Sequence, residues 1–227
     1  MKLAEKSMSG IFFKTGLVVA GLVIAQLHTP SHAQGVDLGQ RRTQFTPGEL
    51  SLLPPYCDTK HRDAKWNSVI GSDIRHMHHY CRGLRDMNYA RMTPLPANQR
   101  NFLWERSITE FTYMIRRSRP DMVLMPEVYV KMGEAHLHLN QFIDAEAAFS
   151  NARNLKPDYA TAYVLPAEKL IDLKLYTRAR DLLETGLRHA PNDKSIQAQL
   201  ARLPKGGEPS SPPPEKTGDL ASPTPEN

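Results

Sequence analysis

The fold is decided by residues 126–193, which form two consecutive units of 34 residues. The first unit, 126–159, reads PEVYVKMGEAHLHLNQFIDAEAAFSNARNLKPDY, and the second, 160–193, reads ATAYVLPAEKLIDLKLYTRARDLLETGLRHAPND. Residues of the same type recur 34 positions apart, namely Tyr129 and Tyr163, Ala145 and Ala179, and Pro157 and Pro191. A fixed period of this length indicates a repeat architecture, which outweighs local propensity in fixing a fold.

The order of large and small residues in both units resembles the tetratricopeptide repeat. The matching residues are Tyr129, Met132, Gly133, Ala145, Phe149, Ala152 and Pro157 in the first unit, and Tyr163, Ala167, Leu170, Ala179, Leu183 and Pro191 in the second. The resemblance implies an antiparallel helix pair in each unit, with small residues at the close approach of the helices and large ones in the seam. His136, Pro166 and Gly186 depart from the pattern. Pro166 is expected to kink or shorten the first helix of its unit, because proline lacks the backbone N–H.

The flanking segments predict further helices. Residues 66–91 contain no proline and many helix formers, and residues 98–118 carry apolar side chains at the three-to-four spacing of a buried helical stripe. We therefore predict a degenerate hairpin of the same type over 48–125, repeats over 126–159 and 160–193, and a capping helix over 194–203. No segment shows sustained strand alternation. The predicted fold is an all-α solenoid of about three antiparallel helix pairs plus the cap.

Both ends of the chain differ in composition from the rest. Residues 1–33 have a lysine-rich start, a short apolar run and small residues at Ser31 and Ala33, which is typical of a signal peptide cleaved before Gln34. An uncleaved anchor is the alternative. Residues 34–47 are expected to be a flexible lead and 204–227, rich in proline, a disordered tail. The expected location is periplasmic or secreted, with no membrane span after cleavage.

Charge and motifs exclude several functions. The chain has 29 bases and 24 acids, and removal of residues 1–33 takes away three bases and one acid, which leaves a net charge of +3. Together with export, this small excess argues against a nucleic-acid partner. The sequence contains no nucleophile elbow, zinc-protease motif or phosphate-binding loop. We therefore expect neither an enzyme nor a cofactor.

Cys57 and Cys81 are the only cysteines. In an exported protein they are expected to pair, because the compartment is oxidising. The blocks LPPYC and HHYC around them resemble those of small exported proteobacterial tetratricopeptide repeat proteins, and this resemblance implies a recurring structural bridge. A redox or metal-binding pair is the alternative.

The histidines beside Cys81 allow two interpretations. His76 and His79 share one helical face, so that they could offer two imidazoles to zinc or copper, with Asp73 or His61 as a third ligand. Alternatively, the rings pack this helix against 98–118 and form local hydrogen bonds. The metal site would make the protein a periplasmic metal-handling protein.

The family resemblance places a partner-binding groove on the first helix of each pair. The corresponding residues are Glu127, Val130, Lys131, Glu134, Leu137, His138, Thr161, Val164, Leu165, Glu168, Ile171 and Asp172. Of the Lys, Asn and Arg residues that grasp a chain terminus in some family members, only Lys131 is present. The mixed apolar and acidic groove would suit a peptide with basic flanks. The predicted function is an exported scaffold or adaptor for protein–protein interaction in the cell envelope, in an assembly or export complex.

Overall fold

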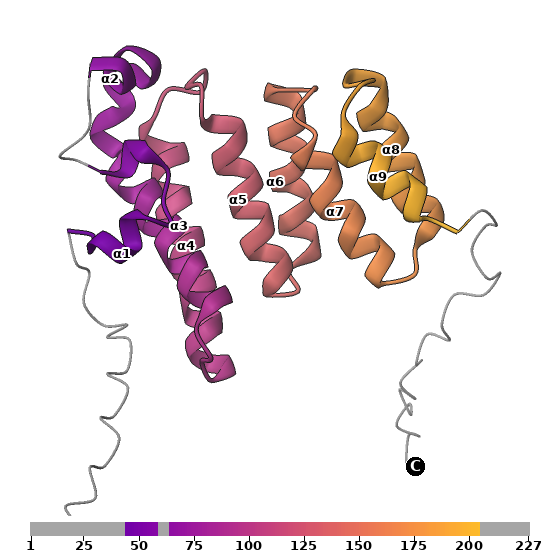
Figure 1. Cartoon of the computed structure of the whole chain (residues 1–227), viewed down its shortest axis with the longest axis horizontal. Coiled ribbons are helices and arrows are strands. Elements are labelled where there is room, and N and C mark those ends of the chain that lie inside the picture. Colours follow the sequence, from indigo (N-terminus) through magenta and orange to yellow (C-terminus); the bar gives the residue numbers. More distant parts are fainter. Residues whose placement is uncertain (1–43, 59–63, 205–227) are drawn as a thin grey trace, which may run out of the picture. The chain divides into compact units, whose positions relative to one another are not determined.

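The structure is a computed structural model that describes residues 44–58 and 64–204 (Figure 1). Its elements are α1 (Pro47–Leu50), η1 (Pro55–Cys57), α2 (Ala64–Ile70), η2 (Gly71–His76), α3 (Met77–Met92), α4 (Ala97–Arg117), α5 (Met125–His138), α6 (Phe142–Leu155), α7 (Thr161–Asp172), α8 (Tyr176–His189) and α9 (Lys194–Arg202), where η denotes a 3₁₀ helix. The described residues contain no strand, which confirms the all-α prediction. The predicted signal peptide, most of the lead and all but the first residue of the predicted tail lie outside them, as does His61.

Consecutive helices form antiparallel pairs. The packed pairs are α3 with α4, α5 with α6, and α7 with α8, and α9 packs on α7 and α8 (Figure 1). The first helices of the pairs also contact one another, α3 with α5, α5 with α7, and α7 with α9. We call α3, α5, α7 and α9 the first-helix layer. The pairs and the cap confirm the predicted repeat fold.

Glycines set the closeness of the helices within the two repeats. An added Cβ on Gly133 of α5 would lie 2.9 Å from the Phe149 ring of α6. On Gly186 of α8 it would lie 2.7 Å from the Tyr163 ring of α7. Both rings are buried. Gly186, a departure from the family pattern, is therefore explained by its contact: the large residue comes from the first helix of this pair and the small one from the second.

Pro166 lies inside α7 and is buried there. The helix continues through it from Thr161 to Asp172 and has 12 residues, compared with 14 in α5. Because proline has no N–H, the carbonyl of Ala162 one turn earlier loses its usual partner. Arg153 of α6 donates to this carbonyl instead, at 3.0 Å. The neighbouring helix therefore supplies the hydrogen bond that α7 lacks.

The helix predicted over residues 66–91 is wrong in one respect, because the structure divides it. Gly71 has a φ of +68° and is the first residue of η2, which follows α2 directly and leads into α3. Glycine adopts this left-handed conformation without the penalty that a Cβ imposes. Asp73 in η2 is buried and accepts hydrogen bonds from the backbone N–H and the Nε of Arg119, at 3.2 and 3.0 Å. The break thus brings η2 against the connection between α4 and α5.

Segment 44–58 packs beside α3. Thr46 caps α1 by a reciprocal pair of hydrogen bonds with Glu49, which also accepts from the Tyr89 hydroxyl of α3 at 3.0 Å. Beside this contact, buried Asp86 of α3 accepts two hydrogen bonds from Arg106 of α4, at 2.6 and 2.8 Å.

No helix among the described residues has both the length and the apolar character needed to span a bilayer.

Candidate functional site

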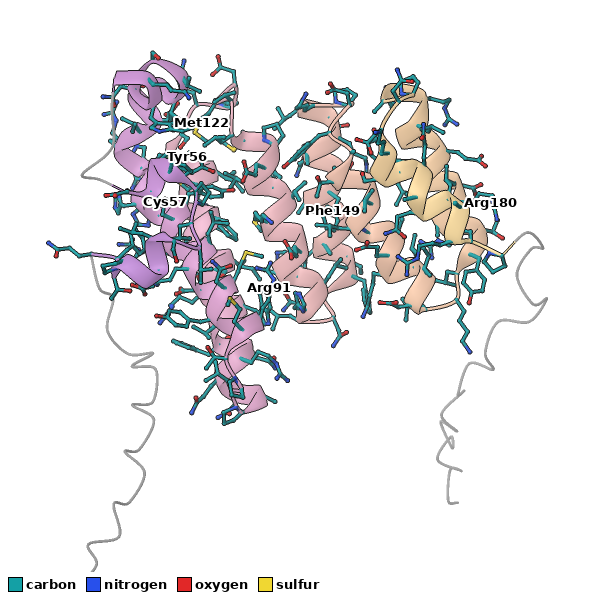
Figure 2. The ribbon with its side chains drawn as sticks, viewed as in Figure 1. Tyr56, Cys57, Arg91, Met122, Phe149 and Arg180 are labelled. Atoms are coloured by element: carbon teal, nitrogen blue, oxygen red, sulfur yellow. A yellow bond between two sulfur atoms is a disulfide. The ribbon has the colours of Figure 1, made fainter. Side chains whose placement is uncertain are left out.

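Cys57 of η1 and Cys81 of α3 form a disulfide, and both residues are buried. Figure 2 shows Cys57 and Tyr56 beside α3. The ring of Tyr56 stacks at 6.3 Å on that of Tyr80, and its edge contacts Trp66 at 5.2 Å. Burial raises the pKa of the Tyr56 hydroxyl well above its usual value, helped by the nearby Glu127 carboxylate. The bridge therefore lies in a packed aromatic cluster that fastens η1 to α3.

His79 makes its contacts with α4. Its Nδ1 donates to Glu110 at 2.5 Å, and its ring stacks on Tyr113 at a centroid distance of 3.6 Å. Arg82 donates to the same Glu110 carboxylate at 3.1 and 3.2 Å. The ring of His76 contacts Tyr113 edge-on at 5.8 Å. Burial lowers the pKa of His79, although its hydrogen bond to Glu110 opposes this effect. These contacts are those of histidines that pack η2 and α3 on α4.

Within the part of the chain that the structure describes, His76 and His79 have no third ligand for a metal ion. Across residues 44–58 and 64–204, no three His, Cys, Asp or Glu side chains come together in an arrangement that could hold a metal ion. Asp73, one of the suggested ligands, binds Arg119. His61, the other, lies outside the described residues.

The structure separates the twelve predicted groove residues into four groups. Val130 is fully buried in a cluster with Ala145, Phe149, Ala152 and Ala162, so its place in the groove is corrected: it belongs to the core. Glu127 accepts a hydrogen bond of 2.6 Å from the buried hydroxyl of Tyr80, and therefore ties α5 to α3. Half-buried apolar or small side chains are Leu137, Thr161, Val164, Leu165 and Ile171. The remaining polar residues are Lys131, Glu134, His138, Glu168 and Asp172.

Glu134 is surrounded by cations. Its carboxylate pairs with Arg91 of α3 and, at 3.2 Å, with Lys131 of the preceding turn. Figure 2 shows Arg91 on the side of α3 that faces α5. The Arg91 guanidinium also lies 5.3 Å from the centroid of Trp104. The acidic character predicted for this part of the groove is therefore neutralised by a residue that the sequence pattern did not indicate.

Glu168 and Asp172 continue the polar surface on α7. The Glu168 carboxylate accepts a hydrogen bond of 2.5 Å from Gln199 of α9, which in turn accepts one from Arg202 at 3.2 Å. Partial burial raises the pKa of Glu168; Arg202 opposes the rise, whereas Asp172 and Glu134 add to it. Asp172 is exposed. The polar side chains of α5, α7 and α9 thus influence one another across the first-helix layer.

A hollow of about 570 Å³ lies where α3 ends, α4 begins and α5 ends. Its lining includes Arg91, Arg100, Trp104 and His138, and we call it the Trp104 pocket. The His138 ring stacks on Trp104 at a centroid distance of 4.0 Å and an angle of 7°. Partial burial lowers the pKa of His138; Glu134 opposes this shift, and Arg91, Lys169 and Arg100 add to it. Sequence reasoning placed His138 on the groove but missed Trp104, although the chain has only two tryptophans.

A second cavity, of about 400 Å³, adjoins the first. Both are lined by Met92 and Thr93 at the end of α3, and the second is also lined by Leu52, Arg85 and Tyr89. Met92 and Leu52, which line the second cavity, are 64% and 53% exposed. We call it the Tyr89 cavity.

The comparison with family models agrees with the repeat pattern. Residues 136–203 match the family model described as tetratricopeptide repeat. A solved structure, the NMR structure of the second TPR domain of the human RPAP3 protein in complex with HSP70 peptide SGPTIEEVD, is similar at 17% identity and a TM-score of 0.40, over 56% of this chain and 95% of that one. None of the curated proteins matches the sequence. Residues 136–203 are accordingly similar to the tetratricopeptide repeat family.

Proposed function

We propose that the protein is an interaction scaffold that holds a protein partner on its first-helix layer. The observation that carries this proposal is the arrangement of polar side chains on the layer: Glu134, His138, Glu168 and Asp172 come from two successive repeats whose first helices are in contact. Stacked repeats create extended surfaces of this kind, which suit an elongated partner.

The composition of the layer supports a protein partner. Half-buried Val164 and Ile171 lie on α7, as do Glu168 and Asp172. Apolar area supplies affinity for a partner, while charged groups determine which partner is accepted and how fast it associates. The basic residues predicted to flank a bound peptide would bind best at α7. Asp172 of α7 has no ion pair within the described residues, whereas Glu134 of α5 is already paired.

Catalysis has no support in the described site. The short hydrogen bond from His79 to Glu110 could suggest acid–base chemistry, but Arg82 and Tyr113 occupy the surroundings of both groups. A general base must be able to reach a substrate proton. We therefore place the function in binding, without a nucleic-acid partner.

The proposed location is the cell envelope, after export and cleavage before Gln34, where the scaffold would serve an assembly or export complex. The sequence of residues 1–33 supports export. The disulfide adds support, because such bonds persist in oxidising compartments and are rare in the cytosol.

Site-specific photocrosslinking in living cells tests the proposal. A photoreactive amino acid is placed at His138 or at Asp172 of the layer, and, in control proteins, at Asp181 or Glu184 of α8, which are also exposed. Partner adducts are expected from the layer positions and not from α8. D172K should reduce adducts formed at position 138 and leave the helical circular dichroism unchanged. Adducts from α8 alone, or from no position, would contradict the proposed function.

A further inference from the structure

The Trp104 pocket carries more positive charge than its neighbours neutralise. Arg91 is paired with Glu134, which is shared with Lys131. Arg100 is exposed and forms no ion pair with any residue that the structure describes. Lys169 of α7 contributes a third positive charge near His138, and its Nζ lies 5.5 Å from the centroid of the Phe142 ring. A carboxylate entering the pocket would therefore meet an uncompensated guanidinium.

Apolar surface continues from this charged pocket. Met92 and Thr93 line both the Trp104 pocket and the Tyr89 cavity, so the two hollows share a wall. Met92 and Leu52 are exposed beside the Tyr89 cavity and would lose contact with water if an apolar side chain entered it. The stacked rings of Trp104 and His138 form part of the lining of the Trp104 pocket.

We propose that these two hollows form one docking site for a segment of the protein partner that carries an acidic side chain, bound in the Trp104 pocket beside Arg100, and a nearby apolar side chain, bound in the Tyr89 cavity. This inference rests on the proposed function and specifies the partner. Concave hollows favour inserted side chains over a flat membrane surface, because a bilayer would contact only their rims.

Charge complementarity determines the expected sequence of the partner. An acidic group gains from Arg100 and from the cations around His138, whereas a basic group would be repelled by them. The partner is therefore expected to carry opposite charges along its length: basic residues opposite Asp172 and an acidic residue at the end of α3. Such polarity would fix its direction on the layer.

Selection from a display library of random short peptides tests the inference. The purified full chain and its R100E variant are used in parallel, and R178E is the matched control, since Arg178 is an exposed arginine of α8. Peptides selected by the wild-type chain should contain Asp or Glu close to a large apolar residue. Their affinity should fall about tenfold or more with R100E, and by less than about twofold with R178E. M92E, a substitution at an exposed position, should also lower the affinity of the chain for the selected peptides.

Four outcomes would overturn the docking site. Selection of basic peptides, or equal affinity for wild type and R100E, would show that Arg100 does not bind an acid. Binding to phosphatidylglycerol vesicles that R100E abolishes, without peptide selection, would make the site a membrane contact. If photocrosslinks at Asp172 persist in R100E and no acidic peptides are selected, the docking site is rejected and the scaffold function is kept. If the wild type itself gives no crosslinks, the proposed function is rejected.

Discussion

Arg153 of α6 donates a hydrogen bond of 3.0 Å from Nη1 to the carbonyl oxygen of Ala162 in α7. That carbonyl would normally accept from the residue four positions later, which here is Pro166. Arg153 is also held by Glu146 and lies 5.6 Å from the centroid of Tyr163. A proline that would weaken an isolated helix is thus accommodated by a side chain of the preceding repeat.

This relationship predicts a conditional loss of stability. R153M keeps the apolar stem of the side chain and removes its donors, so the buried Ala162 carbonyl loses its partner and unfolding should require about 1–3 kcal/mol less. In a P166A background residue 166 regains its N–H, so the Ala162 carbonyl no longer depends on Arg153. R153M should therefore lower the free energy of unfolding by at least about 0.5 kcal/mol less in that background than in the wild type. Urea denaturation of the four proteins measures both values. An equal cost of R153M in both backgrounds would contradict the account.

The close packing of Gly186 on Tyr163 predicts a penalty for a single methyl group. In G186A the new Cβ would lie 2.7 Å from Tyr163 Cγ, and this ring is buried and cannot retreat. We expect a loss of about 1–3 kcal/mol from overpacking. G48A in α1 is the matched control, because nothing lies within 4 Å of its added Cβ. Thermal unfolding should show G186A destabilised and G48A unchanged or slightly stabilised.

The disulfide predicts a redox-dependent stability. Cys57 and Cys81 are 24 residues apart, and a cross-link over this separation stabilises by about 3 kcal/mol in the chain-entropy model. The oxidised chain should be two hydrogens lighter than the reduced one, with both cysteines in one cross-linked peptide. C81S should lower the unfolding midpoint in urea. Free alkylation of both thiols in the native protein would refute the bridge.

Acidification should destabilise the contact between α3 and α4. The pKa of His79 is lowered by burial and by Arg82 and His76, although Glu110 opposes the shift. The folded protein therefore binds this proton more weakly than the unfolded chain does. The contribution of His79 to the free energy of unfolding is therefore complete above about pH 6.5, the usual pKa of a histidine. This contribution is lost as the pH falls below that value.

H79Q measures this contribution. His78 and His138 also have lowered pKa values, so the wild type loses stability from several groups on acidification. The free energy of unfolding should therefore fall less steeply in H79Q than in wild type between about pH 7.5 and 5.5. Identical pH dependence in the two proteins would show that His79 takes no part.

Export predicts a defined mature chain. Intact-mass analysis of the protein from the cell envelope should give a chain that begins at Gln34, as the small residues Ser31 and Ala33 indicate. A membrane-bound chain that retains Met1 would favour the anchor alternative. Replacing Ala33 with a large residue should block cleavage and provides the matched comparison.

The sequence predicted the repeats because their determinants are local. The spacing of Tyr129 and Tyr163, and of Pro157 and Pro191, follows from a helix pair that each unit builds for itself. The division at Gly71 could not be predicted with the same security, because a glycine within an otherwise helical pattern is compatible both with a continuous helix and with a break. The break is accompanied by the contact of Asp73 with Arg119, which are 46 positions apart.

The candidate site shows the same division. The positions of Lys131, Glu134 and His138 within the 34-residue unit placed them on the groove face of the first helix, since the family pattern assigns a face to each position of the unit. The burial of Val130, the pairing of Glu134 with Arg91 and the stack of His138 on Trp104 join different helices. Such contacts depend on how the helix pairs pack, which no local spacing encodes.

The sequence by itself determined the helices of the two 34-residue units, their pairing within each unit and the types of side chain on α5 and α7, because helical periodicity acts over short separations. The tertiary structure alone decided which charges are neutralised, which carbonyl Arg153 satisfies and where the Trp104 pocket lies. Those features arise between residues distant in the chain, since electrostatic and packing energies depend on distance in space and not on sequence separation.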